Sequence, residues 1–484
     1  MQKFVSKYAL AAHLALLAVA PLFLFPFCGQ GWISATLICL SLFAAVWVFI
    51  EPSRRANEML HDARLRVACE CAVDPLFWFS LVIVLFYAVA GLNGGVGMVY
   101  DAESSNWRLA GASAAFLPGS AEGGAGFAFS MSVALVVVLA GCRHALGKTA
   151  RIVFLLSGSF FSGVAALTAG VLCASGNAYL TDLAQCRYYD ASFVGVAFGL
   201  WLMASMTVLV GLFEVNLKRF VPFLFIGLGG SAVGLFLFAP VSVVLLFVLM
   251  SVIVLIASLV YGGVKMSSVT APKCLALLSV MLALPVAFCV CVLPPPLISA
   301  KISAIMDMSL FPEDFSAARD LLSSFALKSW SERPWLGSGM GSFPLNIRFF
   351  AGDADWEVIT TWQKGALNGW LQLLSERGII GMIMVISPFL FLLWTYILRF
   401  SCIFRKKEPF SIVSLVCAIH PACILGPLAV AAVALCGFVD YSFYRQEVYL
   451  AAASFFALAG SFFPVRRKKS EEDDSMNSEA ENVR

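Results

Sequence analysis

The sequence predicts an all-α polytopic membrane protein with about twelve transmembrane helices and one large hydrophilic loop outside the cytoplasm. The first observation is compositional: 61% of the 484 residues are hydrophobic and only 13% are charged, against roughly 25% charged residues in soluble domains. Charged side chains are scarce because lipid cannot solvate them. The second observation is a series of apolar runs, each close to the roughly 20 residues that cross a bilayer.

Twelve runs qualify as spans, with boundaries accurate to a few residues. They lie near 8–27, 32–50, 75–92, 126–142, 152–173, 191–213, 220–238, 240–261, 273–293, 379–400, 411–436 and 446–463. The first run follows Lys3 and Lys7, as in a signal sequence. Because the second run follows almost at once, we expect the first to remain as an uncleaved span.

The basic residues predict how these spans are oriented, since Lys and Arg concentrate in cytoplasmic loops. With the N-terminus inside, the cytoplasmic side receives Lys3, Lys7, Arg54, Arg55, Arg64, Arg66, Arg143, Lys148, Arg151, Lys218, Arg219, Lys265, Lys273, Arg399, Arg405, Lys406, Lys407, Arg466, Arg467, Lys468 and Lys469. The short outside loops hold only Arg108, Arg187 and Arg445. The pattern predicts an even number of spans with both termini in the cytoplasm.

Four regions follow from this topology. Residues 1–293 hold spans one to nine, 294–378 form the large outside loop, and 379–465 hold spans ten to twelve. Residues 466–484 are basic and then rich in Ser, Glu and Asp, which predicts a disordered cytoplasmic tail. Residues 54–71 are expected to form a short interfacial helix. No internal repeat is visible, so the sequence gives no support for an inverted-repeat transporter.

The large loop predicts two amphipathic helices. The first begins near Pro312, because proline and acids suit a first helical turn. Its apolar stripe has Arg319 at the edge and consists of Phe315, Ala318, Leu322 and Phe325.

A glycine-rich turn at 333–343 and a second helix, Lys364–Arg377, follow. Polar side chains recur at every fourth position of this second helix, at Lys364, Asn368, Gln372 and Glu376. The opposite face is apolar, with Leu367, Trp370, Leu371 and Leu374. We expect the helix to lie in the membrane interface and its polar ridge to face a site above it.

In this loop the sequence resembles the bacterial O-antigen ligase/polymerase family. The family pattern is an arginine, a tryptophan about ten residues on, a proline with spaced glycines, a His-Asn pair, and an amphipathic helix that ends in Glu-x-Gly. The matching residues here are Arg319, Trp330, Pro334, Gly337, Gly339, Asn368, Leu371, Glu376, Gly378 and Gly381. The segment 187–198 also resembles an arginine-bearing stretch of the family. The resemblance is firm over about 310–400.

The resemblance implies a twelve-span glycosyltransferase of the bacterial inner membrane, with the large loop in the periplasm. The implied partners are an undecaprenyl-diphosphate-linked glycan donor, a glycan, lipid A core or protein acceptor, and membrane lipid. It implies no cofactor and no metal. The net charge of +3 is too small to suggest nucleic acid as a partner.

Two positions depart from the family pattern. Leu367 stands where the family has its histidine, and a second histidine is absent near Cys436 and Gly437, although Asp440 remains. The histidine-assisted mechanism of the family therefore cannot be transferred whole.

The predicted chemistry is displacement of a lipid diphosphate by an acceptor hydroxyl. Guanidinium groups suit the diphosphate because they stay charged and bind its oxygens bidentately. Arg187 and Arg319 are the candidate catalytic residues, with Arg333 and Arg348 as further contacts to the donor. Stabilising charge at the leaving group is the largest catalytic effect expected here.

Glu376 is the candidate general base, with Lys364, Asn368 and Gln372 as substrate-binding neighbours. Simpler roles stay open for all these residues. The arginines also suit a solvent-facing loop and an interfacial anchor, and the polar ridge suits a solvated helix face. The glycine-rich turn lacks the lysine of a phosphate-cradling loop.

Two other functions stay open. A multi-span transporter or flippase shares the span count, but transporters of this size usually place their long loop in the cytoplasm and carry intramembrane charges. A catalytically degenerate family member that only binds lipid-linked glycan is compatible with the missing histidine.

Overall fold

The computed structural model describes most of the chain. The described residues are 2–24, 30–52, 58–92, 97–101, 106–110, 124–177, 180, 192–265, 271–306, 315–352, 355, 358–359, 365–404, 420–438, 445–459 and 462. The 466–484 tail, for which disorder was predicted, lies outside these residues.

The described chain is predominantly helical, as the sequence predicts, and each of the twelve apolar runs overlaps one helix. The long helices are α1 (Gln2–Leu24), α2 (Gln30–Ile50), α4 (Pro75–Leu92), α5 (Gly124–Ala140), α6 (Lys148–Ala174), α8 (Ser192–Glu214), α9 (Val221–Phe238), α10 (Val241–Lys265), α11 (Ala271–Val292), α16 (Gly369–Phe404), α18 (Ala422–Cys436) and α19 (Gln446–Ala459). The helix expected near 54–71 is α3 (Leu60–Val73), and the short turns η1 (Gly141–Ala145) and η3 (Lys218–Phe220) join neighbouring helices.

Eight helices in the described part of the chain are long and apolar enough to cross a membrane. They are α2, α4, α5, α6, α8, α9, α10 and α16. Four shorter apolar segments lie in α1, α11, α18 and α19. Several long apolar helices indicate a multi-pass membrane protein. A helix can lie in hydrocarbon because its backbone hydrogen bonds are all made within the helix.

The bundle is held together by close contacts between helix backbones. Where α6 meets α9, a Cβ atom added to Gly163 would lie 2.4 Å from the carbonyl oxygen of Ile226. A Cβ added to Gly227 would lie 2.7 Å from the backbone of Ser159 on α6. Small residues at such crossings let two helices approach closely, which drives helix association where lipid surrounds both.

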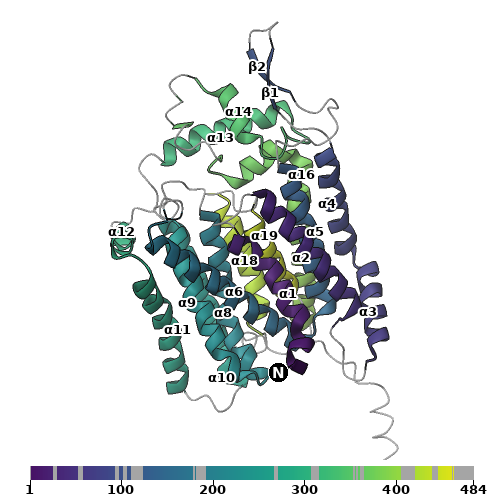
Figure 1. Cartoon of the computed structure of the whole chain (residues 1–484), viewed down its shortest axis with the longest axis vertical. Helices are drawn as coiled ribbons and strands as arrows, with labels where there is room; N and C mark the ends of the chain where they lie inside the picture. Colours follow the sequence, from purple (N-terminus) through teal and green to yellow (C-terminus); the bar gives the residue numbers. More distant parts are fainter. Residues whose placement is uncertain are drawn as a thin grey trace, which may run out of the picture.

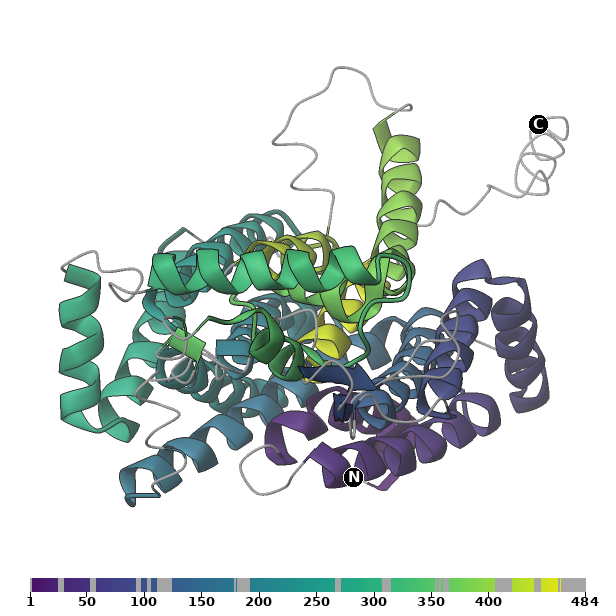
Figure 2. The ribbon, with the colours of Figure 1, turned by 90° about the horizontal axis from the view of Figure 1, so that it is seen from above.

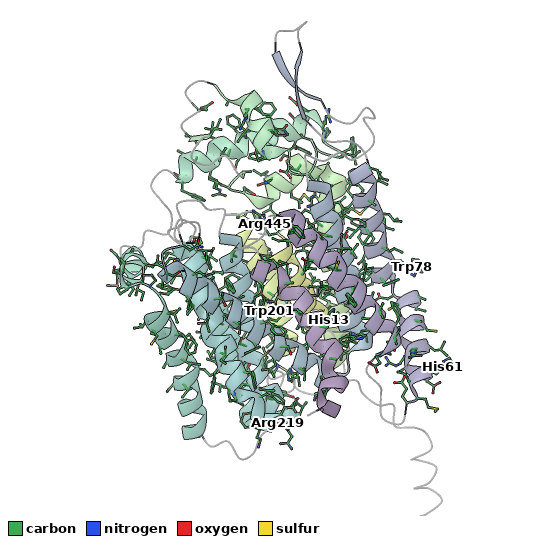
Figure 3. All side chains as sticks on the ribbon, viewed as in Figure 1. His13, His61, Trp78, Trp201, Arg219 and Arg445 are labelled. Atoms are coloured by element: carbon green, nitrogen blue, oxygen red, sulfur yellow. The ribbon has the colours of Figure 1, made fainter. Side chains whose placement is uncertain are left out.

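The two ends of the bundle carry different elements (Figure 1). The Gln2 end of α1 lies at one end, and α13 (Phe315–Glu332) and α14 (Phe343–Phe350) cover the other. Arg219 and His61 lie towards the Gln2 end, whereas Arg445 lies beneath α13 and α14 (Figure 3). The charge pattern of the sequence predicts the same separation, with Arg219 on one side of the membrane and Arg445 on the other.

Helices α13 and α14, with the segment before α16, form a separate layer over the bundle. Seen along the bundle, α13 lies across the ends of the spanning helices (Figure 2). This layer has its own apolar core, made by Phe315, Ala318, Leu322, Phe325, Ala326, Phe343, Ile347, Ile359, Ala366 and Leu367. Because these residues come from α13, α14 and the segment before α16, their burial holds the layer together.

A short antiparallel hairpin lies at the same end, a feature that the sequence analysis did not anticipate (Figure 1). Strand β1 (Gly97–Asp101) pairs with β2 (Asn106–Ala110), with Gly97 opposite Ala110 and Asp101 opposite Asn106.

Candidate functional site

Helix α13 confirms the first predicted amphipathic helix of the loop. Phe315, Ala318, Leu322 and Phe325 are all buried in the layer core. Their spacing places them on one side of the helix, packed against α14 and the segment before α16. Arg319 is half-buried next to Ala318, at the edge of the stripe as predicted.

The glycine-rich turn interlocks with the start of α16. The amides of Ser338 and Gly339 donate to the carbonyls of Ser375 and Glu376, at 2.9 Å each, and the amide of Ile379 donates to the carbonyl of Pro334 at 3.0 Å. These bonds join two segments about forty residues apart into one backbone structure.

Two glycines with left-handed backbone make this interlock possible. Gly337 has φ +70° and Gly378 has φ +62°. A Cβ atom at Gly337 would lie 2.4 Å from the backbone of Glu376, and one at Gly378 would lie 2.4 Å from the backbone of Trp335. Each position therefore requires glycine for two reasons, the left-handed φ angle and the close approach of the other segment's backbone. Gly378 also breaks α16, at the boundary predicted between the loop and span ten.

Glu376 binds the glycine-rich turn from below. Its carboxylate accepts hydrogen bonds from the backbone amides of Gly341, at 2.8 Å, and Phe343, at 3.1 Å. The side chain is 1% exposed. Because Phe343 begins α14, the negative charge also lies at the positive end of that helix. This geometry gives Glu376 a positioning role and leaves little of the carboxylate for an acceptor hydroxyl.

The prediction of the second amphipathic helix was wrong about where the helix starts and about the role of its polar face. The helix begins at Gly369, because the Asn368 side chain accepts from the amides of Trp370 and Leu371 and caps it. Gln372 accepts from the amide of Ala366 at 3.1 Å and lies 3.4 Å from the Glu376 carboxylate. All three predicted ridge residues that the structure describes are buried, so they organise the loop instead of facing a site above it.

The start of α16 also rests on the end of α18. The amide of Gly369 donates to the carbonyl of Gly437 at 2.8 Å, and the Trp370 indole donates to the carbonyl of Ala434 at 3.2 Å. These bonds use carbonyls that the end of α18 leaves unpaired.

Arg377, next to Glu376, points the opposite way and was not singled out from the sequence. Its guanidinium lies 5.0 Å from the centre of the Tyr87 ring and donates to the Tyr87 hydroxyl on α4. The side chain is 2% exposed. A Cβ atom at Gly381 would lie 2.3 Å from Cβ of Arg377, so glycine there makes room for it. The sequence signal for this residue was a charged side chain directly before an apolar run, where charges are costly unless they have a partner.

The remaining candidate arginines lie on the surface of the layer. Arg333 is exposed in the turn after α13, and Arg348 is exposed in the last turn of α14. Arg187 and Lys364 lie outside the described residues, as does Asp440. The structure therefore brings together Asn368, Gln372 and Glu376, whereas Arg319 is half-buried and Arg333 and Arg348 are exposed.

Leu367, at the position where the resemblance implies a histidine, belongs to the apolar core of the layer. It is 4% exposed and has φ +49°, a left-handed conformation that bulky residues rarely adopt. The strain is held in place by the Asn368 cap and by the surrounding core.

Buried polar residues that the sequence analysis missed connect α13 with α14. The Ser329 and Ser338 hydroxyls lie 2.8 Å apart, and the Asn346 amide donates to Ser329 at 2.9 Å. No periodicity marks them, because their partners lie on other elements.

Within the described residues, no three His, Cys, Asp or Glu side chains are grouped as metal ligands. No known family model matches the sequence, and no curated protein matches it either.

Proposed function

We propose that this protein is an inner-membrane glycosyltransferase of the O-antigen ligase/polymerase type. All twelve apolar helices cross the membrane in this proposal, with both termini in the cytoplasm and the 294–378 layer in the periplasm. The protein transfers or polymerises glycan from an undecaprenyl-diphosphate donor without a metal.

The observation that carries the proposal is the interlock of the residues on which the resemblance rests. Gly337 and Gly378 are in mutual backbone contact, and Glu376 binds the turn between Gly339 and Phe343. The Trp330 indole donates to the carbonyl of Pro334 at 3.2 Å. Residues that are far apart in the sequence pattern thus form one structural unit. This is expected if the pattern marks residues that share a functional site.

The proposed reaction is attack of an acceptor hydroxyl on the anomeric carbon of the donor sugar. The bond from that carbon to the diphosphate oxygen breaks, undecaprenyl diphosphate leaves as an anion, and the proton of the acceptor hydroxyl passes to water. Arg319, half-buried at the edge of α13, and Arg187 are proposed to stabilise the leaving charge. Arg333 and Arg348 supply further positive charge to the donor, and Glu376 holds the loop in place.

One observation favours the degenerate alternative, a protein that binds lipid-linked glycan without transferring it. Leu367 replaces the histidine that would act as general base, and its burial in the layer core leaves no titratable group there. General bases contribute roughly 10²–10⁴-fold to a rate. An active enzyme of this type must therefore depend more on stabilisation of the leaving group.

Glycan profiling of membranes from a deletion strain tests the proposal. Collapse of the polysaccharide ladder to a single repeat would identify a polymerase, and accumulation of complete lipid-linked polymer in the periplasmic leaflet would identify a ligase. Accumulation confined to the cytoplasmic leaflet would indicate a flippase and would contradict the proposal, as would an unchanged profile.

A further inference from the structure

Helix α12 (Pro295–Met306) lies outside the layer core and packs against the side of the bundle through Leu297 and Ile298. It is seen almost end-on in Figure 1 and lengthwise in Figure 2, so its axis runs across the direction of the spanning helices. It follows α11 directly and lies at the end of the bundle that carries α13.

One side of α12 is fixed to the bundle by Lys301. Its ammonium donates to the carbonyls of Phe236, Leu237 and Ala239, at 3.1 Å for Leu237 and 2.7 Å for Ala239. These carbonyls belong to the end of α9, where a cation is favoured by unpaired oxygens and by the helix dipole. Lys301 is 8% exposed and is the one charged residue in the sequence of α12.

The outer faces of α12 are amphipathic. Ile302 and Met306 lie four positions apart and so share one flank, whereas Ile298 packs against the bundle core. Ile302 is 50% exposed and Met306 is 77% exposed. Ser303 is also exposed and lies about 60° further round the helix than Met306 and about 100° further than Ile302, on the side away from Lys301.

The apolar flank continues an apolar surface. On α11, which leads into α12, Val286 and Val290 are each 63% exposed. On α10, which also contacts α12, Leu249 is 59% exposed. Large apolar side chains on the outside of a multi-pass bundle face lipid.

We propose that α12 lies in the membrane interface at the end of the bundle that carries α13, with Ile302 and Met306 in the acyl-chain boundary and Ser303 in water. Its occupant is the lipid surface, because the flank carries no charge and is continuous with the lipid-facing sides of α10 and α11. The Lys301 contact with α9 sets the depth of the helix. The following layer, beginning with α13, is then held at a fixed height above the lipid, whatever reaction it performs.

Depth-dependent quenching tests this placement. Single cysteines replace Ile302, Met306 or Ser303 in a full-length chain whose accessible native cysteines are alanine, and each carries an environment-sensitive fluorophore. The protein is reconstituted in phosphatidylcholine vesicles with doxyl-labelled acyl chains or with iodide in the buffer. Leu249 on α10 serves as the lipid reference, and exposed Ser331 on α13 serves as the water reference.

The proposal expects probes at 302 and 306 to be quenched by doxyl lipid as strongly as the probe at 249, and several-fold more strongly than the probe at 303. The probe at 303 should match the probe at 331 in its response to iodide. Equal quenching of 302 and 303 by both agents would overturn the proposal, as would iodide quenching at 306 that matches 331. All these sites are exposed, so the labels disturb little packing.

Discussion

At the scale of single residues, the Glu376 carboxylate ties the glycine-rich turn to α16. The buried carboxylate accepts hydrogen bonds from two backbone amides. These bonds stabilise the turn more than bonds to a neutral acceptor would, because charge-assisted hydrogen bonds are stronger. Its neighbour Arg377 binds Tyr87 on α4. Two successive residues therefore join the layer above to the bundle below.

Replacement of Glu376 by glutamine tests this positioning role. Glutamine keeps the shape of the side chain but loses the charge and one acceptor oxygen, so one of the two amides of Gly341 and Phe343 loses its acceptor and the other bonds to a neutral one. Hydrogen bonds to charged groups contribute about 1.5–3 kcal/mol, so amide exchange across 339–346 should rise by roughly tenfold or more in hydrogen–deuterium exchange. The matched control is Glu332→Gln, at an exposed acid that ends α13.

The alternative role for Glu376 is that of general base. In that case Glu376→Gln would remove activity while exchange across 339–346 stayed at the wild-type rate, and this result would contradict the positioning role.

Part of this residue-scale structure was readable from the sequence. The apolar stripe of α13 and the edge position of Arg319 follow from helical periodicity alone. The polar ridge was misread because spacing gives the face of a helix but not what covers it. Asn368 could have been recognised from the sequence as a helix cap, since asparagine is favoured at the position before a helix. The hydrogen-bond partners of Glu376 could not be recognised in this way, because Gly341 lies 35 residues away in the sequence.

At the scale of elements, the break in α16 at Gly378 joins a loop helix to a spanning helix. An alanine there must adopt φ +62° and place its Cβ 2.4 Å from the backbone of Trp335. A left-handed non-glycine residue costs about 1–3 kcal/mol even without a clash. We therefore expect Gly378→Ala to lower the midpoint of thermal unfolding in detergent by several degrees.

The control for this substitution is Gly126→Ala in α5, where an added Cβ meets nothing within 4 Å. It should leave the unfolding midpoint near that of wild type or raise it slightly. Equal midpoints for Gly378→Ala and Gly126→Ala would show that the interlock contributes nothing to stability.

The junction of α3 and α4 predicts a pH dependence. Asp74 accepts from His144 at 2.8 Å and pairs with Arg143 at 2.8 Å. Burial favours the neutral carboxyl, but the His144 hydrogen bond and the Arg143 charge outweigh it, so the pKa of Asp74 lies below its ordinary value. A depressed folded-state pKa contributes stability that is present above the unfolded pKa of about 3.9. This stability is lost as the pH falls through the folded-state value.

Asp74→Asn removes this contribution. The variant should therefore unfold at a lower temperature than wild type at neutral pH, and the difference should shrink as the pH falls below about 4. Unfolding midpoints at neutral and acidic pH measure it. A difference that is the same at both pH values would show that the ionised carboxylate is not the stabilising species.

At the scale of the whole molecule, the periodic and compositional signals of the sequence are strong and the fold follows them. Each predicted apolar run overlaps a helix, because twenty apolar residues in succession leave few alternatives. The hairpin of β1 and β2 was missed, because its short strands lie in a loop without a clear alternating pattern.

The orientation of the bundle gives a direct prediction. Cysteines at Ser331 on α13 and at Arg219 on η3 lie at opposite ends. In intact cells lacking other accessible cysteines, a membrane-impermeant thiol reagent should label the cysteine at 331 but not the one at 219. Labelling of both before permeabilisation would show leakage of the reagent, and labelling of 219 alone would invert the topology.

Turnover of the lipid-linked donor by purified protein in vesicles tests the central claim most directly. Wild type should release undecaprenyl diphosphate and transfer the glycan to an acceptor, and Arg319→Lys should lose most of this activity at an unchanged protein level. A point charge cannot replace the bidentate guanidinium fork. Arg219→Lys, at the far end of the bundle, is the matched control and should keep wild-type turnover. Wild-type protein that binds the donor without turning it over would contradict the account, as would full activity in Arg319→Lys.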